Sequence, residues 1–70
     1  MDNQTYEPEL PIGFAMLAAQ NLGAMETFGK MSKEQKYAMI DYIQDSATGE
    51  EAENRVEDTV QKLSGGQMQF

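Results

Sequence analysis

Two capping-box patterns constrain this chain more than any other feature, because each one marks the start of a helix. Ser32 is followed three residues later by Gln35, and Thr48 by Glu51. In a capping box the hydroxyl accepts a hydrogen bond from the backbone N–H three residues on, and the longer side chain accepts one from the backbone N–H of the cap. The two patterns therefore predict one helix that begins at Ser32 and another that begins after Thr48.

Two shorter helices are predicted before them. Pro11 suits the first turn of a helix, where its missing N–H costs nothing, and the segment Pro11 to Gln20 is apolar on almost every side. Asn21 is a preferred N-cap residue for a helix from Leu22 to Phe28, which Gly29 would end. No alternating β-branched run is long enough for a strand.

The two longer helices differ in the width of their apolar faces. The third, which runs to about Asp45, has apolar side chains over more than half its circumference, so we expect it to be the central helix of the bundle. The fourth, from Gly49 to Leu63, has a narrow apolar stripe and should dock on one side only. This stripe consists of Ala52, Val56, Thr59, Val60 and Leu63.

The predicted fold class is all-α: a compact bundle of four short helices with disordered N- and C-terminal tails. Seventy residues allow one domain, and without cysteine no disulfide can cross-link it. We expect a flexible N-terminus over residues 1–8, a single helical domain over residues 9–64 and a flexible C-terminal tail over residues 65–70. The tail contains a glycine pair, and two of the four residues that follow it are glutamine.

Composition excludes several classes of function. The chain has no histidine and no cysteine, which removes the usual general base and the usual imidazole and thiolate metal ligands. Four short helices leave little room for a pocket, so we expect no enzyme activity, no cofactor, no metal and no small-molecule substrate. The formal charge of −7 argues against nucleic acid. No apolar run approaches the length of a membrane span, and the polar, acidic start predicts a cytoplasmic protein.

A candidate partner surface lies on the first helix, which carries more apolar surface than a small bundle buries. Ile12, Met16 and Ala19 fall on one side of this helix. We expect Ile12 and Met16 to form an exposed apolar patch that serves weak homodimerisation or the docking of a protein partner.

A candidate acidic surface lies on the fourth helix and consists of Glu50, Glu53, Glu57 and Asp58. These residues lack the alternating spacing and central glycine of a calcium loop. A solvated helix face is the simplest interpretation of such a charge block. The alternative is a surface that attracts a basic partner.

The order of features along the chain carries a family resemblance. A proline-acidic opening, an alanine-rich helix and a short Ala/Phe helix precede a Ser-capped helix and a final leucine. The residues concerned are Glu9-Leu10-Pro11, Met16-Leu17-Ala18-Ala19, Ala24, Phe28, Met31-Ser32, Tyr42-Ile43, Arg55-Val56, Val60, Leu63 and Gly65-Gly66. From Glu9 to Gly66 the chain resembles the C-terminal helical region of the YdeI/OmpD-associated, or bacteriocin-protection, proteins. It is also similar to short helical proteins of anaerobic Gram-positive bacteria.

The resemblance implies a helical module more than a particular activity, because the matching residues are mostly core and cap positions. A basic run typical of the family is replaced here by residues 51–55, which keep only Arg55, and its tryptophan is replaced by Tyr42. We therefore predict a small non-catalytic protein–protein interaction or accessory module, with an unknown protein partner or a weak homodimer. The alternative is a stand-alone regulatory or immunity-type protein that binds a basic partner through its acidic surface.

Overall fold

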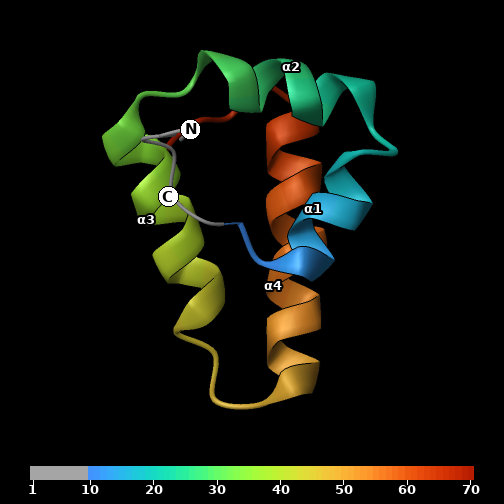
Figure 1. Ribbon diagram of the computed structural model, residues 1–70, viewed down its shortest axis with the longest axis vertical. Helices are drawn as coiled ribbons and strands as arrows, with labels where there is room; N and C mark the ends of the chain where they lie inside the picture. Colours follow the sequence, from blue (N-terminus) through green and yellow to red (C-terminus); the bar gives the residue numbers. More distant parts are fainter. Residues whose placement is uncertain (1–9) are drawn as a thin grey trace, which may run out of the picture.

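The computed structural model describes residues 10–70, so the predicted flexible N-terminus over residues 1–8 lies outside the described residues. Within the described range the chain is all-α and contains no strand, which confirms the predicted fold class of four helices (Figure 1). The helices are α1 (Ile12–Ala18), α2 (Leu22–Lys30), α3 (Lys33–Gln44) and α4 (Gly49–Ser64). None of the helices in residues 10–70 is long and apolar enough to cross a membrane.

The predicted helix starts are confirmed by their hydrogen bonds. Ser32 Oγ accepts from the Gln35 N–H at 3.1 Å, and Gln35 Oε1 accepts from the Ser32 N–H at 2.8 Å, which completes the capping box of α3. At α4, Thr48 Oγ1 accepts from the Glu51 N–H at 3.1 Å. The Glu51 side chain accepts instead from the Ala47 N–H at 3.1 Å. The second box is therefore closed one residue earlier than the pattern predicts.

The predicted end of α2 is wrong, although its start is right. Asn21 Oδ1 accepts from the Ala24 N–H at 3.0 Å, as expected of an N-cap. Gly29, however, lies inside the helix, which continues to Lys30 and ends at Met31 in an extended conformation. Met31 is buried, so the helix stops where this side chain turns into the core. Burial of Met31 sets the boundary here, rather than the conformational freedom of Gly29.

Replacing Gly29 by alanine should therefore stabilise the protein by about 0.5–1 kcal/mol, because alanine restricts the unfolded chain and favours a helix. Gly29 is exposed, and an added Cβ would meet no atom within 4 Å. Thermal unfolding followed by circular dichroism measures the change. Gly66→Ala is the matched control and should destabilise, since Gly66 has a φ of 91°. A loss of stability in Gly29→Ala would show that α2 ends at the glycine after all.

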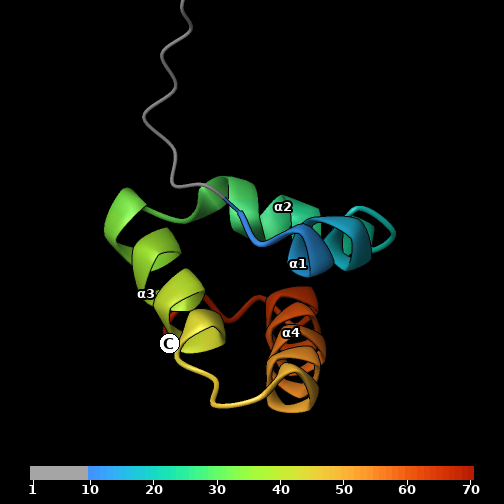
Figure 2. The ribbon, with the colours of Figure 1, turned by 60° about the horizontal axis from the view of Figure 1, so that its bottom comes forward.

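The expectation that the third helix is central, with the fourth docked on one side only, is also wrong. α4 packs against α1, α2 and α3, whereas α3 has its main helix contact with α4. Figures 1 and 2 show α1 and α2 over one side of α4 and α3 beside another. The buried residues of α4 lie between Val56 and Leu63 in this longest helix, and all three other helices pack against it. On α3, Tyr37 of the broad apolar face remains 47% exposed.

The core lies between α4 and the three other helices. Phe14 of α1 is 1% exposed, and its ring lies 5.8 Å from that of Phe28 on α2, centre to centre. The buried apolar residues are Phe14, Ala18, Ala24, Met31, Met39, Ile40, Ile43, Val56, Val60 and Leu63.

The C-terminal residues, for which we expect a flexible tail over residues 65–70, have no regular structure after Gly66 and contact the core in part. Met68 and Phe70 are partly buried against the core. The ring of Phe70 lies 6.2 Å from that of Tyr42, and the Lys62 ammonium lies 5.9 Å from the Phe70 ring centre. The ring of Phe70 is stabilised by its contact with the ring of Tyr42. The composition of the tail does not predict this contact.

Candidate functional site

A groove of about 590 Å³ runs between α1 and α4, with part of α3 in its wall. Its lining combines apolar side chains with two carboxylates. The principal lining residues are Ile12, Met16, Leu17, Ile43 and Val56, together with Glu53 and Glu57. Gly13 also lines the groove and leaves room there, since no atom lies within 4 Å of the position of its absent Cβ.

The predicted apolar patch is exposed in the structure. Ile12 is 78% exposed and Met16 is 62% exposed, and both line the groove. Ala19 is exposed at the C-cap of α1 and is not among the residues that line it. The cause is helical periodicity: Phe14 and Ala18 turn into the core, and residues two positions away in a helix point to nearly the opposite side.

The predicted acidic surface is divided by the structure into separate places. Glu53 and Glu57 are exposed one helical turn apart and line the groove. Glu50 is exposed in the first turn of α4 and lies outside the groove lining. Asp58 lies on a different face, where it is bound by other side chains. Among residues 10–70 no group of three or more potential metal ligands is brought together.

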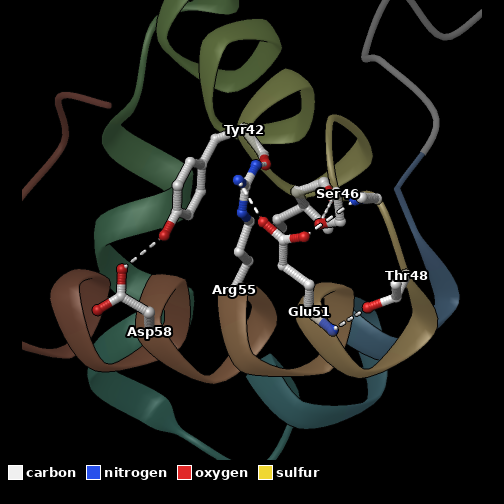
Figure 3. A network of polar contacts seen from close by, with 8 residues as sticks. Tyr42, Ser46, Thr48, Glu51, Arg55 and Asp58 are labelled. Carbon is white, nitrogen blue, oxygen red and sulfur yellow. Dashed lines mark hydrogen bonds and ion pairs between the residues drawn. The ribbon is translucent and has the colours of Figure 1, made fainter.

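A polar network that the sequence analysis did not predict joins α3 to α4 (Figure 3). Arg55 donates to the backbone carbonyl of Tyr42 at 2.6 Å and to Glu51 at 2.7 Å. The Tyr42 hydroxyl donates to Asp58 at 3.1 Å. The carbonyl of Tyr42 is one of the last four of α3, which have no partner inside the helix, so Arg55 satisfies it. The guanidinium also lies 4.9 Å from the centre of the Tyr42 ring.

Lys62 completes this network from the next turn of α4. Its ammonium lies 3.0 Å from Asp58 and 5.7 Å from the centre of the Tyr42 ring. A second, open cavity of about 650 Å³ adjoins the network, lined in part by Tyr42, Arg55 and Phe70. The cations of this face are already engaged with carboxylates and aromatic rings. The network therefore acts as a clamp between the helices, and the groove between α1 and α4 is the better candidate site.

The sequence contained part of the signal for this clamp. Glu51 with Arg55, and Asp58 with Lys62, are spaced four residues apart, as ion pairs on one helix face are. Nothing in that spacing says that both pairs meet the ring of Tyr42 on another helix. That contact depends on how α3 and α4 pack.

The hydrogen bond from Lys62 lowers the pKa of Asp58 below its ordinary value of 3.8, and the Tyr42 hydroxyl lowers it further, against the opposing effect of burial. A carboxyl whose pKa is lowered by folding stabilises the protein at pH values above its ordinary pKa. This contribution to stability is lost as the pH falls through the lowered pKa.

Lys62→Gln should therefore raise the midpoint of the Asp58 titration, measured by NMR of the carboxyl carbon. Lys30→Gln on α2 is the control. An unchanged midpoint in Lys62→Gln would contradict the assigned cause.

The fold and the groove define a small all-α protein with an exposed apolar site that has acidic residues at its rim. The family model of the bacteriocin-protection, YdeI or OmpD-associated proteins matches residues 7–66. The chain therefore belongs to this family, as its resemblance indicated. Searches of curated proteins and of solved structures gave no match. Two positions that carried the resemblance, Tyr42 and Arg55, contact each other in the clamp.

Proposed function

We propose that this protein is a non-catalytic interaction module that binds a protein partner in the groove between α1 and α4. The observation that carries the proposal is the exposure of Ile12 and Met16 at the edge of this groove. Exposed apolar side chains gain about 25 cal/mol for each Å² that a partner removes from water. Clustered apolar residues with polar residues beside them are typical of protein interaction sites.

The family and the chemistry of the groove support two versions of this role. Membership of the bacteriocin-protection family supports an accessory or protective function, which a binding module would perform without chemistry of its own. The second candidate is a regulatory or immunity-type protein with a basic partner. The position of Glu53 and Glu57 at the apolar groove favours it, because a partner could use both kinds of contact there.

The test replaces Ile12 and Met16 together by glutamate. We expect the helical circular dichroism to remain intact, since both side chains are exposed, while partner capture or self-association is abolished. Leu22 and Met25 on α2 provide a matched control, because they are also large, apolar and exposed but do not line the groove. The double variant Leu22→Glu/Met25→Glu should keep binding. Binding lost only in that control would place the partner surface on α2, and unfolding of Ile12→Glu/Met16→Glu would make those residues part of the core.

A further inference from the structure

We propose that the partner presents an amphipathic helix with two basic residues one turn apart, which pair with Glu53 and Glu57 while its apolar face lies in the groove. This inference rests on the proposed function and specifies the chemistry of its partner. The apolar part of the groove comes from three helices, through Met16, Ile43 and Val56 among others. A helix laid between two helices, with its apolar face inward, is a recurrent mode of recognition for a groove of this kind.

The two glutamates differ from the other acidic residues of α4. Glu51 is paired with Arg55 and Asp58 with Lys62, and Glu50 lies outside the groove lining. Glu53 and Glu57 make no ion pair within residues 10–70, and no lysine or arginine lines the groove beside them. They are the carboxylates of this helix that stand at an apolar surface and are available to an incoming cation.

The spacing of the two carboxylates sets the spacing expected of the partner. Positions four residues apart lie about 6 Å apart along a helix axis. Lysine or arginine side chains at positions i and i+4 of a bound helix would therefore match Glu53 and Glu57 in register. Met16 adds tolerance to this fit, since its unbranched thioether side chain repacks easily against different surfaces.

Charge argues against the other occupants of the groove. A second copy of the chain carries a formal charge of −7. Its Arg55 and Lys62 are held by carboxylates of its own, and its Lys33 and Lys36 have interactions of their own. Lys30 alone does not supply the two cations that Glu53 and Glu57 call for. The segment over residues 2–9 contains three acidic residues and no basic one. Either occupant would bring negative charge to a rim that is already negative. A separate, basic partner relieves this repulsion instead.

The experiment uses the full chain as bait for a display library of helical peptides with randomised surface positions. We expect enrichment of peptides with Lys or Arg at i and i+4 beside an apolar face. Glu53→Gln/Glu57→Gln should weaken the enriched peptides roughly five- to tenfold, as the loss of two partly exposed ion pairs implies. Glu26→Gln/Glu50→Gln makes the same change in net charge away from the groove and should have little effect. The charge-reversed bait Glu53→Lys/Glu57→Lys should select acidic pairs instead.

The outcomes separate this inference from the proposed function. Peptides that lack basic pairs, yet lose binding to Ile12→Glu/Met16→Glu, would overturn the basic helix and leave the groove as the binding site. Equal weakening by both pairs of glutamine substitutions would show diffuse attraction to an acidic protein and would also overturn it. Peptides that bind Ile12→Glu/Met16→Glu as well as the unaltered chain would overturn both proposals. A library in which no helical peptide is enriched would overturn the basic helix alone, because the proposed function does not require a helical partner.

Discussion

Replacing Phe14 by alanine should leave the protein largely unfolded at room temperature. Phe14 is 1% exposed, contacts the ring of Phe28 and is the largest side chain that α1 places in the core. Truncation of a buried phenylalanine to alanine typically costs about 3–5 kcal/mol, through lost burial and the cavity that remains. A domain of this size rarely has more than about 3–5 kcal/mol of stability in total. The substitution therefore removes most or all of the free energy of unfolding.

Urea unfolding followed by far-ultraviolet circular dichroism measures this effect. The matched control is Ile12→Ala on the same helix, because Ile12 is 78% exposed and its truncation should change stability by about 0.5 kcal/mol or less. If Phe14→Ala keeps a cooperative transition whose midpoint shifts no further than that of Ile12→Ala, then α1 is not docked through Phe14. The groove beside α1 would then lose its structural basis as well.

Local hydrogen bonding made much of the fold predictable from the sequence. The starts of α2, α3 and α4 follow from Asn21, Ser32 and Thr48, because a cap acts within four residues of itself. The exposure of Ile12 and Met16 was predictable for a related reason, since helical periodicity places them opposite Phe14 and Ala18. Both features depend on a few neighbouring residues.

The central position of α4 could not be predicted in the same way. Seven of its sixteen residues are charged, and its stripe contains small side chains such as Val56 and Thr59. A count of apolar residues therefore favours α3. The number of neighbours that a helix contacts depends on its length and on how closely others approach it. The end of α2 shows the same limit, since the helix continues through Gly29 and ends at the buried Met31.

The division of the acidic surface has a similar explanation. Once the face of α4 with Val56, Val60 and Leu63 is fixed in the core, the remaining carboxylates fall to its two sides. Glu53 and Glu57 then lie toward α1, and Asp58 lies toward Tyr42 of α3. The sequence gives the angle between these positions, but only the packing of α1 and α3 decides which side has a groove and which a clamp.

Replacing Thr59 by valine should stabilise the protein by about 1–2 kcal/mol. Thr59 is fully buried in the middle of the stripe of α4, and its hydroxyl has no hydrogen-bond partner. A buried hydroxyl without a partner loses its hydrogen bonds to water and forms none in the protein, which costs free energy on folding. A methyl group of similar size makes no hydrogen bonds to water, so its burial carries no such cost. Valine keeps the branched shape of threonine, so the packing around the residue should be retained.

Thermal unfolding checks this expectation, because a change of 1 kcal/mol shifts the Tm of such a small domain by roughly 4–8 °C. Thr59→Ser is the matched control: it keeps the hydroxyl, loses the buried methyl group and should lower the Tm. A lower Tm in Thr59→Val would mean that the hydroxyl has a partner in solution, such as a backbone carbonyl of the preceding turn or a buried water. A higher Tm together with unchanged peptide binding would show that the buried hydroxyl lowers the stability of the protein and that binding in the groove does not depend on it.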